Sequence, residues 1–161
     1  MINLIALVAL LQSTSTLVGS STGLPNYVSA KHAITLHGWL NSNPGYRLAL
    51  DTDCGCDSDI EELRKGSGGK WKPQPDYHPF YVAGDFNSDG KEDFAVILLR
   101  GAQRYIAVFN AGSMHPAYIG SSDAGSLFFG PPRPAPYRLV IGGFGSEGKV
   151  LEPHGNSYVL K

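Results

Sequence analysis

Side chains that carry oxygen ligands alternate along a short turn near the middle of the chain, in the stretch GDFNSDGKED at residues 84–93. Side chains at alternate positions of a tightly wound loop face a common centre, and a main-chain carbonyl completes the series. The set consists of Asp85, Asn87, Asp89, the carbonyl of Lys91 and Asp93. Gly90 allows the positive φ with which such a loop doubles back. Because hard oxygen ligands suit calcium better than zinc or copper, the spacing predicts a calcium site.

The longer stretch GDFNSDGKEDFAV, residues 84–96, resembles the calcium loop of FG-GAP and VCBS-type repeats, in which the loop joins two strands. This resemblance implies that the side chains of Asp85, Asn87, Asp89 and Asp93 bind calcium. The stretch is also EF-hand-like over nine positions, but Val96 replaces the glutamate of the twelfth position and both flanks have strand composition. Without that glutamate we expect a dissociation constant on the order of 10⁻⁴ to 10⁻³ M. Calcium would then act mainly as a structural staple between strands.

The two cysteines, Cys54 and Cys56, are separated by one residue. This spacing is compatible with a local disulfide, with thiols that stay reduced until they meet a partner, and with redox exchange. A bridge this short closes almost no loop and would add little stability. The acidic residues around the cysteines suggest a second calcium loop; they are Asp51, Asp53, Asp57, Asp59 and Glu62. The match fails at two positions, because Gly55 stands where a ligand belongs and Cys56 where the loop glycine belongs.

A third group of residues, in the segment WKPQPDYHPFY at 71–81, combines aromatic rings with a carboxylate and an imidazole. The candidates for a ligand surface are Trp71, Asp76, Tyr77, His78 and Tyr81. Such residues suit a carbohydrate or a peptide, and a proline-rich loop packed on a sheet has the same composition. The chain contains no H-E-x-x-H motif and no phosphate-binding glycine loop, so we expect no enzyme. A hydrolase or hydrolase-accessory protein that holds its substrate with segment 71–81 is the alternative.

The expected elements place these groups on the loops of an α+β domain. Helical spacing predicts a helix that opens near Pro25 and stops before Pro44, and a capping box of Ser58 and Glu61 predicts a short second helix over 58–65. Strand composition is found at 46–50, 78–86, 93–100, 104–112, 126–130, 137–144, 149–153 and 157–161, and a loop is expected at 130–136. We therefore expect a mostly antiparallel β-sheet with a helix on one face. A closed propeller is excluded, because the chain has a single copy of the calcium motif.

Length and composition favour a single domain over residues 22–161. The apolar run at residues 1–11 and the small polar residues after it are typical of a secretory signal peptide over residues 1–21, with an apolar helix of the fold as the alternative. This run is too short to span a membrane. The net charge of −1 and the lack of a basic stripe argue against binding to nucleic acid. We expect a secreted or periplasmic, calcium-binding interaction module whose partner is a protein or a carbohydrate.

Overall fold

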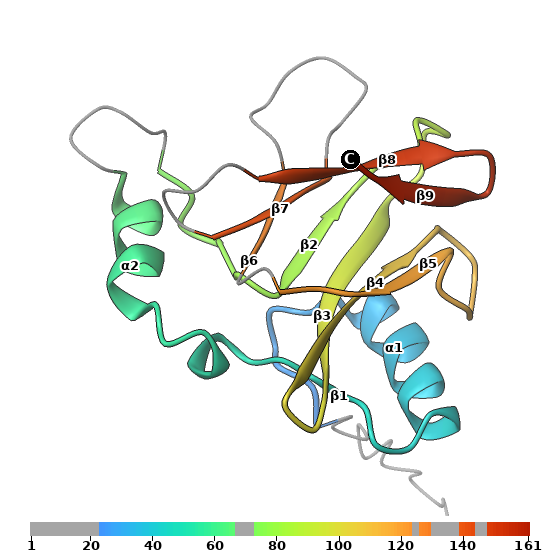
Figure 1. The fold of residues 1–161 in the computed structure, drawn as a ribbon, viewed down its shortest axis with the longest axis horizontal. Helices are drawn as coiled ribbons and strands as arrows, with labels where there is room; N and C mark the ends of the chain where they lie inside the picture. Colours follow the sequence, from blue (N-terminus) through green and yellow to red (C-terminus); the bar gives the residue numbers. More distant parts are fainter. Residues whose placement is uncertain (1–22, 67–72, 124–125, 130–138, 144–147) are drawn as a thin grey trace, which may run out of the picture.

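The computed structural model of the chain describes residues 23–66, 73–123, 126–129, 139–143 and 148–161 (Figure 1). In chain order, the elements are α1 Ala30–Ser42, β1 Arg47–Leu48, the 3-10 helix η1 Asp51–Asp53, α2 Asp57–Lys65, β2 Tyr81–Gly84, β3 Asp93–Arg100, β4 Gln103–Phe109, β5 Tyr118–Ser121, β6 Ser126–Phe129, β7 Leu139–Gly142, β8 Lys149–His154 and β9 Ser157–Leu160. The expected signal peptide, Trp71 and the expected loop at 130–136 lie outside the described residues.

The described strands form two antiparallel sheets. In the first sheet the order is β1-β3-β4-β5, and β2 pairs with the part of β3 that precedes its pairing with β1. The second sheet has the order β6-β7-β8-β9. Figure 1 shows the second sheet lying across the first, with α1 on the other side of the first sheet. The α+β class with mostly antiparallel strands is confirmed, but the strands form two sheets where we expected one.

Strand β3 explains why an unbroken apolar run follows the acidic loop in the sequence. All of its residues except Arg100 are buried. Because successive side chains of a strand point to opposite faces, alternate residues from Phe94 pack with α1, while alternate residues from Ala95 pack between the two sheets. A strand that is covered on both faces needs an apolar side chain at nearly every position.

Helix α1 begins later than we expected. Pro25 lies in a preceding turn, where its carbonyl accepts a hydrogen bond from the N–H of Val28 at 3.1 Å. The helix starts at Ala30, because the side chain of Ser29 caps it by accepting the N–H of His32 at 3.3 Å. A serine cap satisfies one of the unpaired amides at a helix N-terminus. The expected end before Pro44 is confirmed, since the helix stops at Ser42.

The expected capping box of helix α2 does not form. The helix begins at Asp57, so Ser58 lies inside the first turn, and Cys56 occupies the cap position without a side-chain hydrogen bond. The tight turn of residues 54–56 therefore sets the start of the helix. At its other end, Gly66 adopts a φ of 78°, which agrees with the expected glycine stop.

Strand β5 was not predicted from the sequence. Its segment YIGS contains a glycine and a serine, which are uncommon in strands, and its side chains alternate between half-buried and exposed. The strand forms because it pairs with β4 along the edge of the first sheet.

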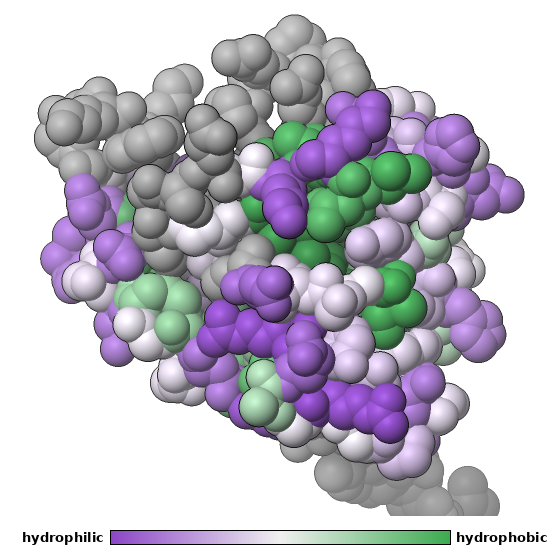
Figure 2. Space-filling model, in the orientation of Figure 1, coloured by the Kyte–Doolittle hydropathy of each residue, from purple (hydrophilic) through white to green (hydrophobic). Residues whose placement is uncertain are grey.

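On the face shown in Figure 2, hydrophobic side chains gather near the β8–β9 hairpin, with hydrophilic residues around them.

His32 is buried in the layer between α1 and the first sheet. Its ring stacks on Phe94 with centroids 4.4 Å apart, and its Nδ1 lies 2.8 Å from the hydroxyl of Tyr81. Its Nε2 lies 3.5 Å from Oε1 of Glu92 without a hydrogen bond. Burial lowers the pKa of His32, and the charge of Glu92 opposes this shift in part.

We expect this histidine to weaken the fold in mild acid. Because its pKa is lowered in the folded state, the unfolded chain binds more protons as the pH falls below about 6.5, and the stability of the fold decreases. His32→Phe keeps a ring against Phe94 and removes the titrating group. Thermal melts across this pH range should show a smaller decrease of the midpoint for the variant than for the wild type. Parallel decreases for both proteins would contradict the assignment to His32.

Candidate functional site

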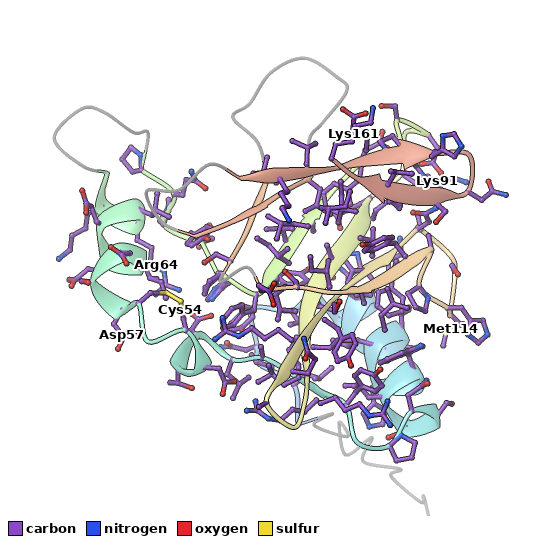
Figure 3. All side chains as sticks on the ribbon, viewed as in Figure 1. Cys54, Asp57, Arg64, Lys91, Met114 and Lys161 are labelled. Atoms are coloured by element: carbon purple, nitrogen blue, oxygen red, sulfur yellow. A yellow bond between two sulfur atoms is a disulfide. The ribbon has the colours of Figure 1, made fainter. Side chains whose placement is uncertain are left out.

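The acidic loop joins strands β2 and β3. Strand β2 ends at Gly84 and β3 begins at Asp93, so both flanks are strands and neither is a helix. Ser88 and Gly90 adopt positive φ values of 62° and 81°, which wind the chain into a compact loop. In Figure 3, Lys91 marks this loop near the β8–β9 hairpin of the second sheet. The loop therefore lies where the two sheets meet.

Main-chain amides of the loop hold its first three oxygen-bearing side chains. Asp85 accepts the N–H of Asp89 at 3.0 Å with one carboxylate oxygen and the N–H of Gly90 at 2.9 Å with the other. Asn87 accepts the same Asp89 N–H at 3.0 Å, and Asp89 accepts the N–H of Lys91 at 2.9 Å. Because all of these donors belong to the loop, the three side chains fold back onto the loop, although Asp89 remains exposed to solvent.

Asp93 anchors the loop to the rest of the fold. Its side chain is completely buried, and its Oδ2 accepts the N–H of Phe86 at 3.0 Å. Its Oδ1 accepts the N–H of Ala111, in the turn after β4, at 2.8 Å. Burial raises the pKa of Asp93, and these two amide hydrogen bonds oppose the rise. The carboxylate thus ties the loop to a segment that is distant in the sequence.

Tyr158 brings the second sheet to the same place. It lies on β9, and its hydroxyl donates a hydrogen bond to Oδ1 of Asn110 at 2.8 Å. Burial raises the pKa of Tyr158 strongly, and the negative charges of Asp93, Asp89 and Asp85 raise it further. The phenol of Tyr158 is therefore within electrostatic range of all three carboxylates of the loop. These charges lie together near the contact between the sheets.

The donor set of the loop fits calcium in its chemistry. It contains three carboxylates, the amide oxygen of Asn87 and the carbonyl of Lys91, and each of these oxygens has lone pairs beyond those used by the amides. Within the described residues, no group of three or more His, Cys, Asp and Glu side chains is arranged to hold a metal ion as it stands. Main-chain amides hold the carboxylates in place, and calcium binding would have to draw these side chains toward one centre.

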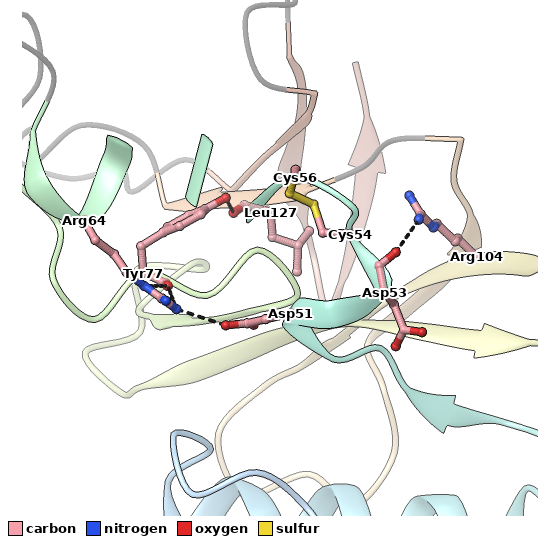
Figure 4. The surroundings of a disulfide bond; sticks show 8 residues. All are labelled: Asp51, Asp53, Cys54, Cys56, Arg64, Tyr77, Arg104 and Leu127. Atoms are coloured by element: carbon pink, nitrogen blue, oxygen red, sulfur yellow. Dashed lines mark hydrogen bonds and ion pairs between the residues drawn. A yellow bond between two sulfur atoms is a disulfide. The ribbon is translucent and has the colours of Figure 1, made fainter. Parts of the chain in front are cut away.

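The second acidic cluster is arranged differently. Both carboxylate oxygens of Asp53 accept hydrogen bonds from Arg47, at 2.7 and 2.8 Å, and one of them also accepts the N–H of Leu50. The Arg47 hydrogen bonds are the main cause that lowers the pKa of Asp53 to about 2. Cys54 and Cys56 form a disulfide beside this pair, close to Arg104, which donates to the carbonyl of Asp53 (Figure 4). Arginine already neutralises this carboxylate, so the cluster does not support a second calcium site.

The aromatic segment lines a cavity of about 490 Å³. Of the residues that we singled out in the sequence, the structure brings together Asp76, Tyr77, His78 and Tyr81 in its wall. Tyr77 is itself buried, and its hydroxyl donates to the carbonyl of Leu127 at 3.1 Å. Tyr27, from the segment before α1, completes this side of the cavity.

Three residues that the sequence did not place at this cavity surround His78. Asp51 places its Oδ2 2.8 Å from Nδ1 of His78, and Arg64 donates to the same oxygen at 2.9 Å. The ring of Tyr27 stacks on the imidazole with centroids 3.6 Å apart and planes 15° apart. Burial and the charge of Asp51 raise the pKa of Tyr27 to about 12. No spacing rule could have found this cluster, because its members come from four separate segments of the chain.

Comparisons of the chain with protein-family models, curated proteins and solved structures gave no match. Within the described residues, no helix has the length and apolar character needed to cross a membrane. The arguments about function therefore depend on the geometry of the acidic loop and of the aromatic cavity.

Proposed function

We propose that the protein is a secreted or periplasmic calcium-binding interaction module in which calcium staples the two sheets. The observation that carries this proposal is the loop between β2 and β3, where loop amides hold the oxygens of Asp85, Asn87 and Asp89 and where Asp93 is buried. Three carboxylates held this close together repel one another, and a divalent cation removes that repulsion. Calcium would thereby strengthen the contact between the loop, the turn after β4 and Tyr158 of β9.

Calcium titration by isothermal calorimetry tests this proposal. We expect one calcium ion to bind per chain. A double variant, Asp85→Asn with Asp89→Asn, keeps one accepting oxygen at each position but removes two charges, so it should show no saturable binding in the same concentration range. Glu92→Gln is the matched control, because Glu92 belongs to the same loop but lies outside the ligand set, and its side chain is exposed.

The partner of such a module would be a protein or a carbohydrate held at the aromatic cavity. Tyrosine rings and a carboxylate in its wall offer stacking faces and hydrogen-bond acceptors to a neutral polar ligand. This part of the proposal is separate from the calcium loop. Capture of partners from the extracellular fraction, with and without calcium, would show whether the two are coupled.

A hydrolase or hydrolase-accessory role is the second candidate function. One observation favours it: His78, in the wall of the cavity, faces the carboxylate of Asp51. A histidine oriented by a carboxylate is a recurrent arrangement for general acid–base chemistry. The same arrangement also joins η1 and α2 to the turn that precedes β2.

A further inference from the structure

The hydrogen-bond pattern around His78 determines which of its nitrogens carries the proton. Nη2 of Arg64 has two hydrogens, and it donates to the carbonyl of Tyr77 at 2.7 Å and to Oδ2 of Asp51 at 2.9 Å. No hydrogen remains for Nδ1 of His78, although that atom lies only 3.2 Å away. The contact of 2.8 Å between Nδ1 and Oδ2 of Asp51 therefore needs a proton on Nδ1. In the neutral ring, Nε2 is then the nitrogen with the lone pair.

This Nε2 is open to the cavity. No hydrogen bond joins this nitrogen to another described residue. It is also not one of the fully buried polar atoms that lack a partner in the described part of the chain, so it remains accessible. The ring is 18% exposed and belongs to the cavity wall. Stacking on Tyr27 fixes the ring plane. The result is an oriented basic nitrogen at the surface of a cavity of about 490 Å³.

The cavity wall restricts the chemistry of a substrate. Among the described residues, no lysine or arginine lines the cavity and Asp76 is its single carboxylate, so these residues offer an anionic substrate no ionic contact. Three tyrosines and Pro75 offer apolar faces. A neutral molecule with an acyl or ring face fits this wall better than a phosphate or a carboxylate does.

We propose that His78 is the general base of an ester-hydrolysing site and that Asp51 is its positioning residue. Nε2 takes a proton from a water molecule as the water oxygen forms a bond to the acyl carbon of a neutral ester. The tetrahedral intermediate then expels the alcohol oxygen, which receives the proton from Nε2, and the acid and the alcohol leave. Water is the only co-reactant, and the imidazole is neutral at the start and at the end. This inference rests on the second candidate function and is independent of the calcium loop.

Charged and titratable groups face this histidine from three elements. Asp51 of η1 and Arg64 of α2 meet at the Nδ1 edge, and Tyr27 covers one ring face. Arg64 shares the carboxylate of Asp51, so the imidazole lies beside an ion pair and not beside an isolated negative charge. Asp51 acts through the proton on Nδ1 and does not touch the substrate.

Hydrolysis of p-nitrophenyl acetate by the full chain tests this assignment. We expect turnover that exceeds the rate of an equal concentration of free imidazole, and a decrease of kcat/KM by about 10- to 100-fold in His78→Gln. His115→Gln, which removes an exposed histidine elsewhere, should keep the wild-type rate. Unchanged turnover in His78→Gln would overturn the assignment to His78 while the hydrolase candidate stands. No turnover by the wild type would overturn both.

A spectroscopic measurement keeps the test decisive if His78→Gln does not fold. Nitrogen NMR of the wild type distinguishes the two neutral tautomers of His78, and the proposal requires the proton on Nδ1. Asp51→Asn should abolish the preference for that tautomer and decrease kcat/KM, whereas a residue that only supports the fold would leave the tautomer unchanged. A proton on Nε2 in the wild type would contradict the proposal.

Discussion

Replacing Asp93 with alanine should lower the free energy of unfolding by about 2–4 kcal/mol, because two main-chain amides lose their acceptor in one change. The amides belong to Phe86 in the acidic loop and to Ala111 after β4. A buried donor without a partner costs about 1–3 kcal/mol, and the alanine side chain cannot reach either amide. Urea denaturation followed by tyrosine and tryptophan fluorescence measures the loss.

Two further variants make this result specific to the buried carboxylate. Asp93→Asn keeps one oxygen as an acceptor and should cost less than Asp93→Ala. Asp123→Ala removes an exposed carboxylate and should stay within about 0.5 kcal/mol of the wild type. A loss below about 1 kcal/mol for Asp93→Ala would mean that water replaces the carboxylate at little cost, and the anchoring role would be wrong.

Replacing Arg64 with methionine should cost about 2–3 kcal/mol, because hydrogen bonds that involve charged groups are the stronger kind. The guanidinium donates twice to the carbonyl of Tyr77 and once to Asp51, so it joins α2 to η1 and to the wall of the cavity. Methionine keeps the unbranched apolar stem but donates nothing. The variant also leaves Asp51 with His78 as its remaining partner in the cluster. Chemical denaturation measures the change.

The neighbouring basic residue provides the matched control. Lys65 lies in the same last turn of α2 and pairs with Glu61, but both side chains are exposed. Exposed pairs of this kind contribute about 0.3–0.5 kcal/mol, so Lys65→Met should have a small effect. Equal losses for the two variants would show that the effect comes from the helix as a whole and not from the contacts of Arg64.

The acidic loop was predictable from the sequence because the residues that define it are close together in the chain. The donors lie within nine residues, and the composition of the flanks distinguishes a strand–loop–strand unit from a helix–loop–helix unit. The alternation of β3 between two packed faces also follows from its apolar run. What the sequence did not reveal is that Asp93 reaches Ala111 and that Tyr158 approaches from the second sheet, because these contacts depend on the tertiary arrangement.

The contacts around His78 also depend on the tertiary arrangement, and the sequence predicted fewer of them. The aromatic segment pointed to residues 71–81, and the structure places four of the five expected side chains around one cavity. Asp51 attracted attention as a member of an acidic cluster and a candidate metal ligand, whereas in the fold it orients a histidine 27 residues away. The expected helix starts were wrong for a related reason, since Ser29 and the turn at Cys54–Cys56 set them in place of the expected signals, whereas the expected helix ends are confirmed.

Calcium binding by the loop between β2 and β3 is the central claim, and calorimetric titration with calcium chloride tests it most directly. The account predicts one ion per chain with a dissociation constant on the order of 10⁻⁴ to 10⁻³ M, no saturable heat for the Asp85→Asn, Asp89→Asn double variant, and wild-type binding for Glu92→Gln. Absence of saturable binding by the wild type at millimolar calcium would contradict the account, and so would equal binding by the double variant.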